Sequence, residues 1–135
     1  MSEPDPHRIT SLEALAALYG EPVQAAVIKE VDHVSEHYRA FIEASPFMIL
    51  ATVGAEGLDC SPRGDYPGVV RALDARTLVL PDRLGNKIAD SMTNITRNGH
   101  IGLLCFVPGM TETLRINGIA KITDEPSVLA MLEQD

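Results

Sequence analysis

The sequence predicts a small, mostly β domain, built as an antiparallel barrel or sandwich with flanking helices. Between residues 47 and 122, five or six short apolar runs are separated by turn signals, a pattern typical of such folds. A helical pattern at residues 86–98 interrupts the strand series and favours a barrel with a helix over one opening. A length of 135 residues leaves room for a single domain.

The composition is that of a globular protein. Hydrophobic residues make up 45% of the chain and charged residues 22%, close to the average for such proteins. No apolar run approaches the ~20 residues that span a bilayer, and no basic start followed by an apolar stretch marks a signal peptide. We therefore expect a cytoplasmic protein that does not bind a membrane.

The charge of the chain is unevenly distributed. The net charge of −8 argues against nucleic-acid binding, which needs a basic surface. Residues 60–121 nevertheless hold eight basic and five acidic residues, a net charge of +3. A basic middle in an acidic chain suggests a local anion site, and chance unevenness is the alternative.

Two helices are expected before the strands. The first begins with the capping-box spacing of Thr10 and Glu13 and ends at Gly20. The second uses Asp32 as its N-cap and stops at Ser45. The segment between the two helices fits either a helical turn or an extended connector.

The strand region opens with a hairpin around the four-residue loop Gly54–Gly57, and a second hairpin follows around the turn Asp74–Arg76. Two further strand-like runs lie at residues 100–107 and 113–122, and Cys105 in the first of these is expected in the core. Residues 126–135 resemble a helix without a final cap, which suggests a chain that continues in a longer protein.

His33, Glu36 and His37 match the H-x-x-E-H pattern of one class of metalloproteases. A zinc site needs a third protein ligand, and no His or carboxylate elsewhere occupies a recognisable motif. Two solvated or half-buried histidines are the better interpretation, so we expect no metal. Cys60 and Cys105 also lack the spacing of metal ligands.

Two loops carry residues suited to an anion. The first, Ser61–Gly68, follows a strand, and its glycines permit close backbone approach while Arg63 offers a planar donor fork. An ordinary connection with Arg63 paired to Asp65 is the alternative. The second, Pro81–Lys87, leaves a strand and leads into a helix.

Asn86 and Lys87 stand in the first turn of that helix. Free backbone N–H groups, the positive helix end and the Lys87 charge would together suit a phosphate. A lysine at this end does not match the helix dipole, so it needs an anionic partner. The alternative is that Lys87 pairs with Asp82 or Asp90.

A third basic residue, Arg115, lies in the middle of a predicted strand. Alternation places Thr113, Arg115 and Asn117 on one face and Leu114 and Ile116 on the other. The apolar face is expected in the core. The polar face is either solvated or part of a dimer cleft.

The segments Ser45–Thr52, Ser61–Gly68, Pro81–Ile95 and Pro108–Ile122, in this order and spacing, resemble the pyridoxamine 5′-phosphate oxidase-like family. The resemblance implies a six-stranded antiparallel split barrel of the FMN-binding type, with Greek-key connections. It also implies a homodimer with FMN at the subunit interface. Residues 1–46 would then form a helical segment packed on the barrel, and residues 47–135 the flavin-binding barrel.

The resemblance also implies a set of flavin-binding residues. A strand-end loop, a strand-to-helix turn with the phosphate-binding Lys87, and a late strand of the other subunit would hold the cofactor. These positions are Ser61, Pro62, Arg63, Gly64, Asp65, Leu80, Pro81, Asn86, Lys87, Thr113, Leu114 and Arg115.

The sequence departs from the true oxidases at two places. They carry an Arg-Lys pair where this chain has Asn86-Lys87, and their substrate-binding Arg and His near the C-terminus have no counterpart before Asp135. The resemblance therefore implies an FMN-dependent oxidoreductase with an unidentified small-molecule substrate. The alternatives are a non-catalytic flavin- or haem-binding module and a partner-binding barrel without a cofactor.

Overall fold

The computed structural model describes residues 3–20, 30–64, 70–82 and 90–132. The chain divides into two compact units, Met1–Asp32 and His33–Asp135. The first unit holds α1 (Leu12–Tyr19), whose residues are all exposed. Its N-cap is Ser11, whose hydroxyl accepts a hydrogen bond from the Ala14 N–H at 3.1 Å. The predicted cap at Thr10 is therefore wrong by one residue.

The second unit begins with α3 (Glu36–Ala44). Ser35 caps this helix by accepting a hydrogen bond from the Tyr38 N–H, so the predicted cap at Asp32 is wrong. The expected stop at Ser45 is confirmed. The Ser45 side chain is fully buried, and its hydroxyl lies 2.8 Å from the Phe47 carbonyl and 2.7 Å from the Phe106 carbonyl.

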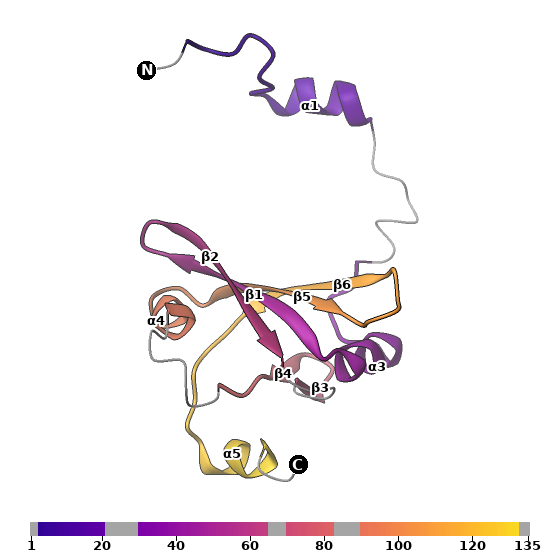
Figure 1. Cartoon of the computed structure of the whole chain (residues 1–135), viewed down its shortest axis with the longest axis vertical. Helices are drawn as coiled ribbons and strands as arrows, with labels where there is room; N and C mark the ends of the chain where they lie inside the picture. The colour runs from indigo at the N-terminus through magenta and orange to yellow at the C-terminus, as the bar shows by residue number, and fades with distance from the viewer. Residues whose placement is uncertain (1–2, 21–29, 65–69, 83–89, 133–135) are drawn as a thin grey trace. The chain divides into compact units, whose positions relative to one another are not determined.

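Four strands form one antiparallel sheet in the order β2-β1-β5-β6 (Figure 1). They are β1 (Phe47–Gly54), β2 (Gly57–Gly64), β5 (His100–Phe106) and β6 (Thr113–Ile119). A second sheet pairs β3 (Arg71–Asp74) with β4 (Thr77–Val79). Because β1 pairs with β5, the chain leaves the large sheet after β2 and returns to it at β5. The predicted mostly antiparallel β fold is confirmed.

The two hairpin turns are tight. The strands β1 and β2 extend to Gly54 and Gly57, so the turn contains only Ala55 and Glu56 instead of the four-residue loop expected. Gly57 continues the strand with φ +136°, a conformation that glycine adopts without strain. In the second turn, the Asp74 carboxylate accepts a hydrogen bond from the Arg76 N–H at 2.8 Å, which lowers the pKa of Asp74.

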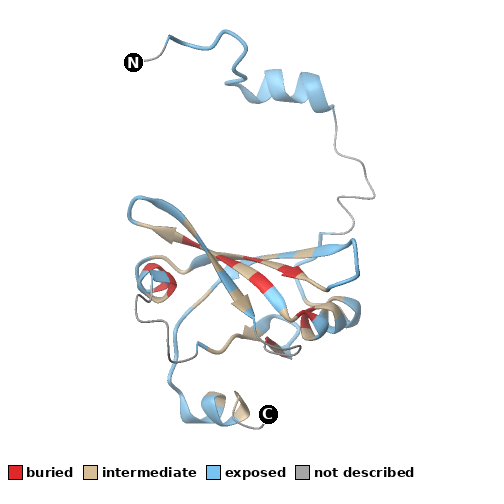
Figure 2. Ribbon diagram, viewed as in Figure 1, coloured by how far each residue is buried: buried red, intermediate tan, exposed pale blue. Residues whose placement is uncertain are grey.

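The core lies on one face of the large sheet (Figure 2). Met48, Leu50, Leu103 and Cys105 are buried there, as alternation along β1 and β5 requires. The residues of this core from outside the sheet are Val34, Phe41 and Ile42 (the last two from α3), Val70, Leu78 and Leu80. The prediction that Cys105 is a core residue is confirmed, and burial raises the pKa of its thiol to about 11.

Two helices complete the described part of this unit. In α4 (Asp90–Arg97), the buried Asn94 donates from Nδ2 to the buried Thr52 Oγ1 at 3.0 Å, which ties the helix to β1. The α5 helix (Pro126–Leu132) is bonded to β3, because Arg71 Nη1 donates to the Met131 carbonyl at 3.0 Å. None of the described helices is long and apolar enough to cross a membrane.

Candidate anion site at the end of strand β2

The end of β2 carries four of the predicted site residues. Their partners on β1 show which way each side chain faces: Arg63 pairs with Met48 and Ser61 with Leu50. Because paired residues face the same side of a sheet, Arg63 and Ser61 lie on the core side. Pro62 and Gly64 lie on the other, outer side.

Gly64 ends the strand with φ +146°. A Cβ atom there would clash with the Pro46 carbonyl oxygen and lie 2.8 Å from the Phe47 Cα. Glycine is therefore required for β2 to approach the start of β1 this closely. This close approach fixes the backbone next to Arg63.

Arg63 is held by an ion pair with Asp82. Its Nη1 donates to Asp82 Oδ1 at 2.7 Å, and the side chains of the two residues are 12% and 36% exposed. Asp65, the alternative partner in the sequence interpretation, lies outside the described residues. Asp82 itself follows Leu80, which packs on the core, and the half-buried Pro81.

The other two nitrogens of Arg63 are buried donors in need of an acceptor. Nε and Nη2 are inaccessible to solvent, and neither has a hydrogen-bond partner in the part of the chain that the structure describes. These two nitrogens form one edge of the guanidinium, and their N–H bonds run parallel, which matches two oxygens of a carboxylate or phosphate. The geometry of β2 therefore provides a donor fork for an oxyanion.

The remaining predicted residues divide into two groups. Asn86 and Lys87 lie outside the described residues, so their place at a helix start stays a prediction. On β6, Leu114 and Ile116 pack on the core while Thr113 and Arg115 are exposed, as the alternation predicted.

Arg115 and Arg63 do not meet within one chain. The register runs from Pro62 through Ile49 and Leu104 to Arg115, which places Arg115 on the outer face of the sheet. Strands β2 and β6 are opposite edges of that sheet, about 14 Å apart across three interstrand spacings. The three predicted segments therefore do not converge in a single protomer.

The contact between Asp82 and Arg63 is not predicted by the sequence, which offers Asp82 only as a partner of Lys87. The contact spans 19 positions of the sequence and depends on where β2 and β4 end. The sequence shows only that Asp82 is a carboxylate directly after a predicted strand, and this position does not indicate that Arg63 is its partner.

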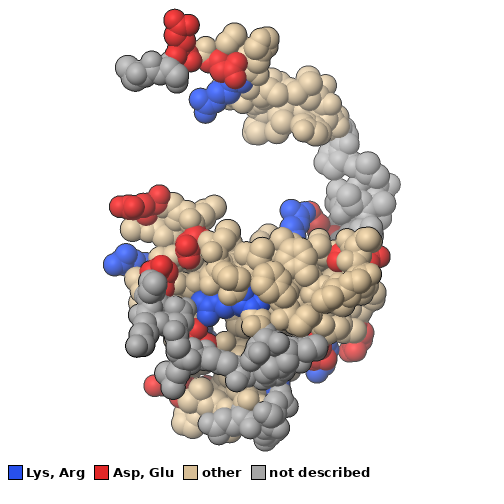
Figure 3. All heavy atoms as spheres, viewed as in Figure 1, with Lys and Arg blue, Asp and Glu red and all other residues tan. Residues whose placement is uncertain are grey.

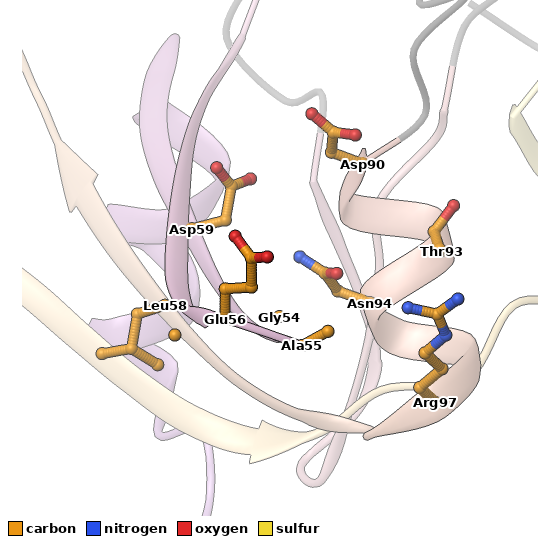
Figure 4. A pocket seen from close by; sticks show the side chains of 10 residues that line it. Gly54, Ala55, Glu56, Leu58, Asp59, Asp90, Thr93, Asn94 and Arg97 are labelled. Atoms are coloured by element: carbon orange, nitrogen blue, oxygen red, sulfur yellow. The ribbon is translucent and has the colours of Figure 1, made fainter.

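A hollow lies between the β1–β2 turn and α4 (Figure 4). It has a volume of about 380 Å³ and is open to solvent. Figure 4 shows Glu56 and Asp59 of the hairpin opposite Asp90 and Arg97 of α4. It lies at the turn end of β2, about 20 Å along the strand from Arg63.

The described residues hold no cluster of three or more His, Cys, Asp or Glu side chains that could bind a metal ion. This finding covers His33, Glu36 and His37 as well as the acidic hollow beside α4. Figure 3 shows basic side chains near the middle of one face of the strand-containing unit, with acidic side chains mostly near its edges.

Comparisons with known proteins agree with this fold. A family profile described as pyridoxamine 5′-phosphate oxidase matches residues 34–135. A crystal structure of a HupZ variant from Group A Streptococcus superimposes with a TM-score of 0.59 and 20% sequence identity, over 75% of this chain and 80% of that chain. No curated protein matches. The profile match over most of the chain, together with the antiparallel strands and the basic strand end, shows that this chain belongs to the pyridoxamine 5′-phosphate oxidase-like family.

Proposed function

We propose that this protein binds FMN, with the FMN phosphate on Arg63, and that it is an FMN-dependent oxidoreductase acting on a small molecule. The observation that carries this proposal is that two buried nitrogens of Arg63 have no hydrogen-bond partner among the described residues. A buried donor without an acceptor costs about 1–3 kcal/mol. A phosphate that accepts from both nitrogens removes this cost and gains two charge-assisted hydrogen bonds.

The composition of the site fits a phosphate monoester. Arg63 supplies a buried cation, and Gly64 leaves the strand end free of a side chain beside it. Lys87, in its predicted position, would add a second cation. The matching family is itself named for a reaction of a phosphorylated compound.

A second copy of the chain would complete the site. Arg115 faces away from Arg63 within one protomer, so a homodimer is the arrangement that would bring Thr113 and Arg115 to the cofactor. The outer face of the sheet supports this, because Ile49, Leu104 and Phe106 are only half-buried there and Phe47 is 45% exposed. Such a dimer interface would also exclude water from the flavin.

Bound FMN would supply the capacity for hydride transfer. The chain's own residues would bind and orient it: the Arg63 fork would hold the phosphate, and Arg115 of the second copy would add a positive charge at the interface. The substrate stays open, because the residues that bind it in the true oxidases have no counterpart in this sequence.

The first experiment compares FMN with riboflavin, which lacks the phosphate, by calorimetry on the purified full chain. Arg63→Ala and Lys87→Met should each weaken FMN binding by about 10- to 150-fold, the range for a lost charge-assisted hydrogen bond. Riboflavin should bind all variants equally. Arg97→Ala, which changes an exposed arginine at the hollow beside α4, is the matched control and should change neither affinity.

The absorbance spectrum then separates the possible functions. Flavin bands that bleach with a reduced nicotinamide cofactor support the oxidoreductase. Flavin that no reductant bleaches indicates a binding module, and a haem spectrum indicates the haem-binding alternative. A colourless protein that binds no added FMN contradicts the proposal.

A further inference from the structure

We infer that Asp82 is the positioning residue of this anion site. It accepts a hydrogen bond from one nitrogen of Arg63 and thereby orients the other two nitrogens toward the ligand. The inference rests on the proposed function, in which Arg63 receives a phosphate. It adds a residue that makes no contact with the ligand itself. The observation behind it is that one nitrogen of Arg63 donates to Asp82, whereas the other two have no partner within the described ranges of the chain.

The guanidinium group is planar, and its N–H bonds have fixed directions. Asp82 Oδ1 accepts a hydrogen bond from Arg63 Nη1, and the two atoms are 2.7 Å apart. Nε and Nη2 form the opposite edge, and this edge carries the two parallel N–H bonds of a fork. Because the three nitrogens share one plane, an anchor at Nη1 sets the direction of the fork.

Both partners of the ion pair stand on well-anchored backbone. Gly64 permits a backbone approach to Pro46 and Phe47 that no other residue allows, and this locks the chain beside Arg63. On the other side, Leu80 is packed against the core two residues before Asp82. The short Nη1–Oδ1 contact therefore joins two anchored stretches of backbone, and we expect it to hold the guanidinium in one orientation without a ligand.

The carboxylate of Asp82 also repels a phosphate, so two effects oppose each other. The Asp82 side chain is 36% exposed, three times the exposure of Arg63. Water and salt therefore screen its charge, whereas the hydrogen bond to Nη1 is direct. We expect the loss of orientation to outweigh the relief of repulsion.

The test measures the affinity of FMN and of riboflavin for Asp82 variants of the full chain. Asp82→Ala removes the acceptor, and FMN binding should weaken about 5- to 20-fold while riboflavin binding stays unchanged. Asp82→Asn keeps an oxygen that accepts from Nη1 and removes the charge, so it should restore FMN affinity to within about threefold of the wild type. Asp82→Leu keeps the size of the side chain without an acceptor and should match Asp82→Ala.

A double-mutant cycle isolates the route through Arg63. In an Arg63→Ala background, Asp82→Ala should leave FMN affinity unchanged, because no guanidinium is left to orient. Asp59→Ala is the control for net charge, since Asp59 lies on the same strand about 13 Å away and has no contact with Arg63 among the described residues.

The possible failures have different meanings. If Arg63→Ala weakens FMN selectively but Asp82→Ala does not, or tightens FMN, the positioning role is wrong and the anion site stands. If Asp82→Ala weakens FMN and riboflavin equally and lowers the melting temperature of the flavin-free protein, Asp82 is merely structural. If Arg63→Ala fails to distinguish the two flavins, the proposed function itself is wrong.

Discussion

Cys105 and Cys60 show how two residues of one type acquire opposite chemistry from their place in the sheet. Cys105 is fully buried near the end of β5, whereas Cys60 is exposed on β2. The thiolate is the reactive form of cysteine, and burial raises the pKa of Cys105 from 9.0 to about 11. The buried residue is therefore a neutral packing group at physiological pH.

The raised pKa of Cys105 predicts an alkaline loss of stability. The thiol is protonated in the folded state and ionises at lower pH in the unfolded state, so its contribution is complete below pH 9 and declines as pH rises toward 11. The free energy of unfolding should fall by roughly 2–3 kcal/mol over this window from this group alone. Denaturant unfolding at a series of pH values measures it.

The matched comparison uses two variants. Cys105→Ala should lose this part of the pH dependence, although it starts from a lower stability because of the cavity it creates. Cys60→Ala should keep the wild-type pH dependence. Identical slopes for the wild type and Cys105→Ala would show that Cys105 ionises alike in the folded and unfolded states.

The sequence predicted the candidate residue Arg63 but not the residue that contacts it. Arg63 was predicted from its type and its place in a glycine-containing strand end, which are local properties. Its contact with Asp82 is a tertiary event, since the ends of β2 and β4 must meet before it exists. Local patterns therefore predicted Arg63 as a candidate donor, and they did not predict its contact with Asp82.

At the scale of elements, hydrophobic periodicity predicted helices and strands well, and exact boundaries less well. The first helix has adjacent candidates, Thr10 and Ser11, and both residue types cap helices. Likewise, Asp32 and Ser35 both precede the second helix, and tertiary contacts determine which of them is the N-cap. The backbone N–H of Val34 donates to the Ala75 carbonyl at 2.7 Å, which ties this stretch to the β3–β4 turn before the helix begins at Glu36.

Alternation along β6 was a stronger guide. It predicted that Leu114 and Ile116 face the core and that Arg115 faces away, and the burial pattern confirms both. The side-chain period of a strand is two, so one apolar face determines the whole assignment. By contrast, no local pattern predicts that Arg63 and Arg115 lie on opposite edge strands of the sheet, because that placement depends on the strand order.

The contact between α4 and β1 depends on one buried hydrogen bond. Asn94 Nδ2 donates to Thr52 Oγ1, and both side chains are buried. Asn94→Ala should lower the free energy of unfolding by about 1–3 kcal/mol, because Thr52 loses its partner. Chemical denaturation checks this.

A double-mutant cycle of Asn94 and Thr52 distinguishes their hydrogen bond from general packing between α4 and β1. In a cycle with Thr52→Val, the double variant should be less destabilised than the sum of the two single variants. Thr93→Ala, an exposed neighbour on α4, should change stability by less than about 0.5 kcal/mol. Additive losses would indicate that the two side chains contribute independently.

At the scale of the whole molecule, the outer face of the large sheet determines the proposed dimer. The rings of Phe47 and Phe106 contact each other there, with centroids 6.1 Å apart and planes tilted by 35°. Phe47→Glu places a charge on this apolar surface, and burying an unpaired charge is costly. The variant should be monomeric by light scattering at micromolar concentration, whereas the wild type should be dimeric.

Leu73→Glu is the control for this substitution. Leu73 is 44% exposed, nearly the same as Phe47 at 45%, but lies on the separate β3–β4 hairpin. It should leave the dimer intact. FMN affinity should fall in Phe47→Glu if the second copy contributes Arg115, and a wild-type monomer that still holds FMN would contradict the shared site.

The strand order has a consequence for synthesis on the ribosome. β1 and β2 emerge together, but β5, which covers the other edge of β1, begins 36 positions after β2 ends. At the usual rates of translation this interval lasts about 2 to 7 s. During that time the nascent hairpin exposes Met48 and Leu50 and an unpaired edge, so the newly made chain needs protection from its neighbours until the returning strand arrives.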